Sequence, residues 1–249
     1  MQNMQISMLN FTKYLFVLLI FMVINPVTLL ASSGSDSGTV SFKKQSSKNH
    51  YISLSGGMGI SYSNNNSLKN YIQYEIPGYP SLTDKQKLSD FNSGLELFGG
   101  IEKQLSRNLS LKGEYSYFIK SNNVTAYPNY DFTYYSHQPG IVLYYLVPQE
   151  YSFIKIGVGA GYSLNHFTFR NFGFETNYNS AGFNLRIDAV FNAQIGKSVA
   201  GYIGGYINNS FLGNLKDSNS LELKARNGDS VNLNSFGIGL KLGLEFYIF

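Results

Sequence analysis

The sequence predicts an all-β protein, an eight-stranded antiparallel up-and-down transmembrane β-barrel, on three observations. In residues 236–248 every second residue is bulky and apolar, from Phe236 to Ile248, while glycine, Lys241 and Glu245 fall between them. A period of two is typical of a strand, and about 9–11 residues of tilted strand cross a bilayer. Seven further segments show a similar alternation, and the connections between them are alternately long and short. A membrane strand needs a closed barrel, because lipid cannot pair with its edge N–H and C=O groups.

The eight expected strands are residues 51–62, 94–103, 109–120, 132–147, 152–169, 183–194, 199–209 and 236–249. Proline has no N–H for a strand ladder, so Pro139 predicts a β-bulge in the fourth strand. The seventh strand is the least marked, because glycines fall on both of its faces. The fold class therefore follows from pattern alone, while the register near Pro139 and in the seventh strand stays open.

The connections separate the two ends of the expected barrel. The short turns are residues 104–108, 148–151 and 196–198, and the long loops are residues 64–93, 121–131, 170–181 and 211–232. Short periplasmic turns and long outer loops are typical of outer-membrane barrels. An even strand count then places both ends of the barrel on the periplasmic side.

Residues 1–31 are predicted to be a signal peptide that is cleaved on export. Lys13 precedes an unbroken apolar run of 11 residues at 14–24. This length fits the hydrophobic region of a leader and is shorter than the roughly 20 residues of a spanning helix. The alternative is an uncleaved N-terminal anchor. Residues 32–49, rich in Ser, Gly and Lys, are expected to be a flexible polar periplasmic arm, and residues 50–249 the barrel domain.

The composition excludes several function classes. The chain has no cysteine, so it can form neither disulfides nor thiolate metal sites. Its formal charge of +4 is mild and no basic run is present, so nucleic acid is not an expected partner. No pair of its three histidines has metal-ligand spacing, and no phosphate-binding loop is found. We expect no metal, no cofactor and no catalytic residue.

The inward-facing positions of the expected strands collect nine charged residues. They form a predicted charge network in the lumen: Glu96, Glu102, Lys112, Glu114, Lys155, Arg186, Asp188, Lys241 and Glu245. An eight-stranded barrel holds side chains or at most one small ligand, so we expect a plugged, salt-bridged interior with a structural role. A conducting pore is the alternative. The near absence of charge on the other face argues against a soluble barrel, and an outward Arg or Lys would cost about 2–4 kcal/mol at the bilayer midplane.

The expected loops carry many aromatic and Asn residues. Tyr and Asn supply contact area and adaptable hydrogen bonds, which suits adhesion or host contact. The alternative is that the loops pack on each other and on lipopolysaccharide. The candidate contact residues are Tyr71, Tyr74, Tyr79, Tyr127, Tyr130, Phe172, Phe174 and Tyr178.

A remote alternative is a lipid hydrolase at the outer leaflet. His166, Thr168 and a carboxylate such as Glu175 would form its triad. The arrangement resembles the lipid A deacylases, but their His-x-Ser-Asn pattern is replaced here by His166-Phe167-Thr168-Phe169. A histidine at the membrane interface is the preferred interpretation.

Residues 51–249 resemble the small outer-membrane β-barrel proteins of Gram-negative bacteria, a group that includes the OmpA membrane domain and the OmpW- and OmpX-like proteins. The leader, the alternating strands rich in glycine and aromatic residues, and the terminal aromatic carry this resemblance. It implies that Tyr247 and Phe249 are an assembly signal, although Phe249 is out of phase with the apolar row ending at Ile248.

The resemblance also implies a location and partners. The expected location is the bacterial outer membrane, and the expected partners are membrane lipid, lipopolysaccharide, the assembly machinery, periplasmic chaperones and a host or surface ligand. The OmpW-like members suggest a second role, a narrow channel for small or hydrophobic solutes.

Overall fold

A computed structural model of the chain describes residues 51–74, 92–124, 130–149, 152–171, 173–196 and 198–248. The predicted signal peptide and polar arm lie outside these residues. No helix among the described residues has the length and apolarity needed to cross a bilayer. The elements in chain order are β1 (Ile52–Asn64), α2 (Asn66–Tyr74), β2 (Ser93–Ser106), β3 (Leu109–Val124), β4 (Tyr130–Pro148), β5 (Ser152–Asn171), β6 (Phe174–Gln194), β7 (Val199–Leu212) and β8 (Ser235–Ile248).

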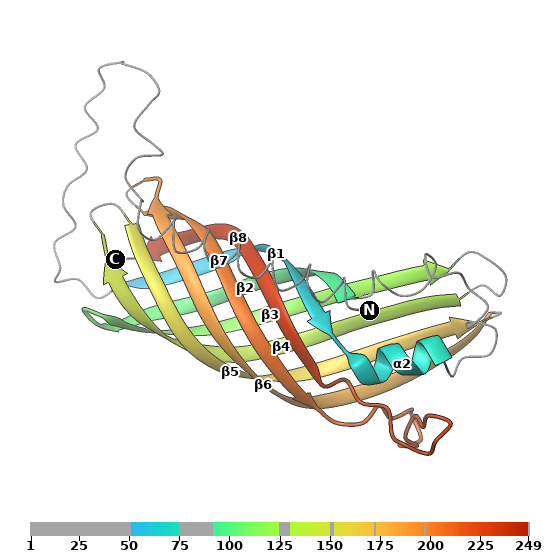
Figure 1. Cartoon of the computed structure of the whole chain (residues 1–249). Helices are drawn as coiled ribbons and strands as arrows, with labels where there is room; N and C mark the ends of the chain where they lie inside the picture. Colours follow the sequence, from blue (N-terminus) through green and yellow to red (C-terminus); the bar gives the residue numbers. More distant parts are fainter. Residues whose placement is uncertain are drawn as a thin grey trace, which may run out of the picture. The chain divides into compact units, whose positions relative to one another are not determined.

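The eight strands form one closed antiparallel barrel, which confirms the predicted fold (Figure 1). Each strand pairs with its neighbours in the chain, and β1 pairs with β8 to close the wall, as in the pair Met58↔Leu242. The closed ladder satisfies the backbone groups that an open sheet would leave unpaired. β7, the least marked strand in the sequence, is continuous and pairs regularly with β6 and β8.

The two faces of the wall have opposite chemistry. Apolar side chains face outward, with exposed fractions of 68% for Ile60, 59% for Ile141 and 57% for Leu242. Charged side chains face inward, and Lys112 and Glu245 are fully buried. This partition is the reverse of that in a water-soluble protein, where charged residues are almost never fully buried unless they are paired.

The β5–β6 connection corrects one prediction. Residues 170–181 were expected to be a loop, but β5 continues to Asn171 and β6 begins at Phe174, with Gly173 at a positive φ of 84° between them. The outward side chains turn polar here, so the apolar alternation that marks a membrane strand is missing although the ladder continues. With 19, 20 and 21 residues, β4, β5 and β6 exceed the 13 and 14 residues of β1 and β8.

The bulge predicted at Pro139 is absent. Pro139 pairs with Tyr115 of β3 in unbroken register, and β4 pairs with β5 in the same register on both sides of it, at His137↔Leu164 and Gly140↔Gly161. The β4–β5 pairing is interrupted at Gln138 and Pro139 themselves. The strand therefore accommodates the missing N–H by giving up local pairing, not by inserting a residue.

The first and last long connections contain local structure that the sequence analysis missed. α2 follows β1 directly, and residues 213–234 fold back through the bridges Asn214↔Asn232, Lys216↔Glu222 and Lys224↔Ser230. Six apolar residues of these two segments pack together and define the cap: Leu68, Ile72, Leu215, Leu223, Val231 and Leu233.

The cap closes one end of the barrel interior. It packs against inward-facing aromatic residues of three strands, Phe118, Phe132, Tyr134 and Phe167, and all members of the cluster are buried. This is the end at which the long connections lie, opposite the short turns. We refer to it as the outer end.

Candidate functional site

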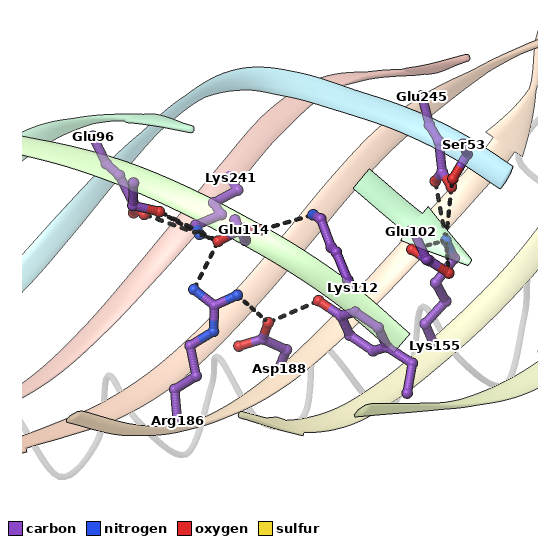
Figure 2. A network of polar contacts seen from close by, with 12 residues as sticks. Ser53, Glu96, Glu102, Lys112, Glu114, Lys155, Arg186, Asp188, Lys241 and Glu245 are labelled. Carbon is purple, nitrogen blue, oxygen red and sulfur yellow. Dashed lines mark hydrogen bonds and ion pairs between the residues drawn. The ribbon is translucent and has the colours of Figure 1, made fainter. Parts of the chain in front are cut away.

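The strands bring all nine predicted charge-network residues into the barrel interior (Figure 2). Eight are buried, and the side chain of Arg186 is 15% exposed. They separate into two clusters. One consists of Glu102, Lys155 and Glu245, and the other of Glu96, Lys112, Glu114, Arg186, Asp188 and Lys241.

In the first cluster one lysine is shared by two carboxylates. Lys155 Nζ lies 2.8 Å from Glu102 Oε2 and 3.0 Å from Glu245 Oε1. Ser110 donates to Glu102 at 2.7 Å and Ser53 donates to Glu245 at 2.5 Å. Hydrogen bonds of this kind offset part of the desolvation of the extra negative charge.

The second cluster is centred on Glu114, whose carboxylate forms ion pairs with three cations and accepts hydrogen bonds from two of them, Arg186 and Lys241. Lys112 Nζ lies 2.7 Å away, Arg186 Nη1 2.7 Å and Lys241 Nζ 2.6 Å. Two further carboxylates balance the surplus positive charge: Arg186 also forms an ion pair with Asp188 at 3.1 Å, and Lys241 forms one with Glu96 at 2.9 Å. The six charges form one connected and formally neutral network.

Aromatic residues complete the second cluster. Tyr144 donates to Asp188 at 2.8 Å, and Tyr206 donates to Glu96 at 2.7 Å. Lys112 Nζ lies 4.8 Å from the centre of the Tyr202 ring, a cation–π contact. The sequence analysis did not select these tyrosines, and it left open the register of the strand that contains Tyr202 and Tyr206.

A fifth inward cation, Lys120, was also missed. It is buried nearer the outer end, where its Nζ donates to Ser63 Oγ at 3.0 Å and lies 4.9 Å from the Tyr134 ring centre. Among the described residues, five cations including Lys120 and five carboxylates lie in the interior, so their formal charges cancel.

The interior around the network is tightly filled. Two cavities of about 20 Å³ lie beside Glu96 and Tyr206, and each has room for roughly one water molecule. In the part of the chain that the structure describes, no group of three or more His, Asp or Glu residues could hold a metal ion. The arrangement can hold strands in register and fill the lumen.

The two predicted assembly-signal residues are placed differently. Tyr247 is buried inside the barrel, where its ring meets that of Tyr51 edge-on at 5.0 Å. Phe246 and Ile248 face outward. Phe249 lies outside the described residues.

The predicted loop contact residues whose side chains the structure describes, Tyr71, Phe174 and Tyr178, differ in exposure. Phe174, at the β5–β6 turn, is 80% exposed. Tyr71 and Tyr178 are partly buried and pack against the buried cluster formed by the cap and the inward-facing aromatic residues. Tyr74 lies in α2 and Tyr130 in β4, and Tyr79, Tyr127 and Phe172 lie outside the described residues.

The hydrolase triad does not form in this structure. His166 contacts the amide oxygens of Asn179 at 2.7 Å and Asn177 at 3.2 Å, and Thr168 donates to Asn177 at 2.7 Å, not to His166. A nucleophile needs its base within hydrogen-bond reach. The sequence could not show that Asn177, brought opposite Thr168 by the β5–β6 pairing, would take this hydrogen bond.

The carboxylate proposed for that triad, Glu175, is also paired elsewhere. Arg170 Nη2 lies 2.6 Å from Glu175 Oε2, and Asn177 donates to Oε1 at 3.1 Å. The hydrogen bond from Arg170 is the main cause that lowers the pKa of Glu175 from its ordinary value. Asp131 lies 4.0 Å from the same guanidinium, so a ladder of charges crosses the outer ends of β4, β5 and β6.

No family model matches the sequence, and no curated protein matches it. Three solved structures of bacterial proteins have a similar chain trace. Neisserial surface protein A is 13% identical, with a TM-score of 0.45 over 78% of this chain and 96% of that one. The attachment invasion locus protein Ail of Yersinia pestis, in complex with the heparin analogue sucrose octasulfate, is 16% identical, with a TM-score of 0.43 over 80% and 99%.

The outer membrane protease OmpT from Escherichia coli is 10% identical, with a TM-score of 0.40 over 87% of this chain and all of that one. The assignment of the present chain as an eight-stranded barrel rests on its own strand pairing.

Proposed function

We propose that the protein is an integral barrel of the bacterial outer membrane that makes surface contacts through its outer end and carries out no catalysis. The observation that carries this proposal is the partition of the wall, apolar outside and charged inside. An outward face of this kind is stable only in lipid, and lipid with the assembly machinery of that membrane would then be its partners.

The proposed orientation is supported by the outer parts of β4, β5 and β6. Outward apolar residues end at the row His137–Leu164–Ala181, and the next rows are Tyr135–His166–Asn179 and Thr133–Thr168–Asn177. An apolar band that gives way to polar strand ends is expected where a wall leaves the bilayer. These strand ends would stand in the outer aqueous layer and present the contact surface.

A solute channel is the alternative role, and the interior supports a closed barrel instead. The ion network fills the middle of the lumen and the cap fills its outer end. Once insertion of the protein into a planar bilayer has been shown, we expect the conductance recording to contain no stable open state. A defined single-channel step of the unaltered protein would favour the channel.

Single-cysteine labelling tests location and orientation together, because the natural chain has no cysteine. Phe174→Cys places a thiol at the exposed β5–β6 turn, and Arg107→Cys places one at the opposite, short β2–β3 turn. A maleimide that cannot cross membranes should label Phe174→Cys in intact cells. It should label Arg107→Cys only after the outer membrane is opened.

The opposite labelling pattern would show that the barrel has the inverse orientation in the membrane. Recovery of the protein in the soluble fraction would overturn the membrane assignment.

A further inference from the structure

A groove of about 790 Å³ lies on the outward face of β4, β5 and β6, where residues 213–222 border it. Six lining residues define this rim groove: Tyr135, His137, His166, Asn179, Lys216 and Glu222. Its volume is within the roughly 300–1,000 Å³ of typical small-molecule sites. No role described above uses it.

The rim groove lies at the border between the apolar and the polar rows of the wall. Tyr135, His166 and Asn179 are paired in one cross-strand row, directly beyond the row that contains Leu164 and Ala181. The backbone pairing of Asn179 with Lys216 attaches residues 213–222 to the edge of β6 that faces away from β5. The groove is therefore built on strands, not on isolated loops.

Ring and amide groups in the groove are held in fixed positions. The His166 ring stacks on Tyr135 with centroids 4.7 Å apart, and its Nδ1 lies 2.7 Å from Asn179 Oδ1. His137 is fixed in turn by Tyr115, whose hydroxyl lies 2.5 Å from Nδ1. Tyr135, His137 and His166 are each only partly buried, so they offer carbon surface as well as polar atoms to a ligand.

The fixed charges of the lining disfavour an anionic ligand. Lys216 is the lining cation and lies 3.6 Å from Glu222, while Asp217 adds a second carboxylate. One positive and two negative charges leave a net charge of −1, which disfavours a phosphate or sulfate group. The remaining polar lining is neutral and includes Asn179, Asn214 and Ser220, with which an acyl chain could form no hydrogen bond.

We propose that the rim groove binds an uncharged saccharide of a glycan outside the membrane. Sugar hydroxyls donate and accept hydrogen bonds, as neutral amide and hydroxyl groups require, and the C–H surface of a sugar ring packs on aromatic carbon. Tyr135 supplies that carbon surface and Asn179 an oriented amide. This inference deepens the proposed function and rests on it, because the groove must face the outside.

The test uses the purified full chain in micelles of an amine-oxide detergent, because detergents with glucoside or maltoside head groups would compete. The protein is applied to an array of neutral, sulfated and sialylated glycans. The strongest neutral oligosaccharide is then titrated by saturation-transfer NMR. We expect neutral glycans to bind, and both Tyr135→Ala and Asn179→Ala to weaken binding by at least about tenfold.

Phe174→Ala is the matched control, since it removes an exposed aromatic ring of the same outer end that does not line the groove. It should change the affinity by less than about twofold. Each variant must first show the heat-dependent gel shift of a folded barrel. If a groove variant does not fold, Tyr135→Phe and Asn179→Gln, which keep the ring and the amide, replace it, with a smaller loss expected for Phe than for Gln.

Three outcomes would overturn the saccharide site. These are the absence of neutral glycan binding, equal affinity in Tyr135→Ala and in the unaltered chain, and tighter binding of sulfated glycans that Lys216→Gln abolishes. Binding is measured on purified protein, so its failure leaves the cell-labelling result intact. Saccharide binding together with failed labelling of Phe174→Cys would instead refute the proposed orientation.

Discussion

The ammonium nitrogen of Lys155 lies 2.8 Å from the carboxylate of Glu102, although the two residues are 53 positions apart and on strands that do not pair with each other. The contact spans the barrel interior from β5 to β2. It is one of the two ion pairs by which Lys155 holds two carboxylates, the second with Glu245 of β8. Three strands are thus tied together through one nitrogen atom.

Replacing this lysine should strongly destabilise the barrel. In Lys155→Met, Glu102 and Glu245 remain buried without their cation, and removing one partner of a buried pair costs about 3–5 kcal/mol. The free energy of unfolding, measured by denaturant titration in lipid vesicles, should fall by that amount. Adding Glu102→Gln and Glu245→Gln to Lys155→Met should restore part of the loss, because no uncompensated charge is then buried.

Lys103→Met is the control, because Lys103 is adjacent to Glu102 on β2 but exposed on the outer face. Its effect should stay within about 0.5 kcal/mol. Equal losses in Lys155→Met and Lys103→Met would mean that the buried triad does not set stability.

A side chain at Gly57 should prevent closure of the barrel. Gly57 faces Gly243 across the β1–β8 seam, and a Cβ built on Gly57 would overlap the Leu242 carbonyl and the Gly243 Cα. Backbone atoms in a ladder cannot move aside as a flexible side chain can, so we expect Gly57→Val not to yield the heat-modifiable folded band.

The neighbouring residue provides the comparison. A Cβ on Gly56 would meet only the Phe98 carbonyl oxygen at 3.6 Å, an ordinary contact. Gly56→Ala should therefore fold normally. Normal folding of Gly57→Val would show that β1 and β8 lie farther apart at Gly57 than they do in this structure.

The cap should be separable from the barrel wall. Leu68 of α2 is fully buried in the cap, and truncation of such a leucine costs about 2–5 kcal/mol. In Leu68→Ala we expect faster proteolysis and hydrogen exchange in residues 213–234, while the barrel keeps its gel shift. Leu221→Ala, at a position 65% exposed, should leave both unchanged. Loss of the gel shift in Leu68→Ala would show that the barrel wall cannot fold without the cap.

The Arg170–Glu175 pair should make the outer hairpin sensitive to acid. The hydrogen bond from Arg170 lowers the pKa of Glu175, so the pair supports the hairpin above the unfolded pKa of a glutamate, about 4.3. That support is lost as the pH falls through the lower folded value. NMR titration of the Glu175 carboxyl carbon should give a midpoint below that of a free glutamate, and Arg170→Ala should raise it. An identical midpoint in both proteins would rule out this pair as the cause.

The alternation of residue types was enough to predict the architecture, the strand order and the charged face of strands such as those that contain Lys112 and Lys241. These features follow from a period of two and from the cost of placing charge in lipid, both of which are local along the chain. It did not reveal that β5 continues to Asn171 and that β6 begins at Phe174, because the outward residues there are polar and the apolar alternation is lost while the strand pairing continues.

Which side chains contact one another became apparent only from the folded barrel. Glu114 rather than Glu96 forms ion pairs with three cations. Asn177 rather than His166 accepts the hydrogen bond from Thr168, and α2 packs with residues 213–234 in the cap. Such contacts depend on the stagger of the strands around a closed wall. Alternation fixes the face on which a side chain lies, but closure fixes its height and its partner across the interior.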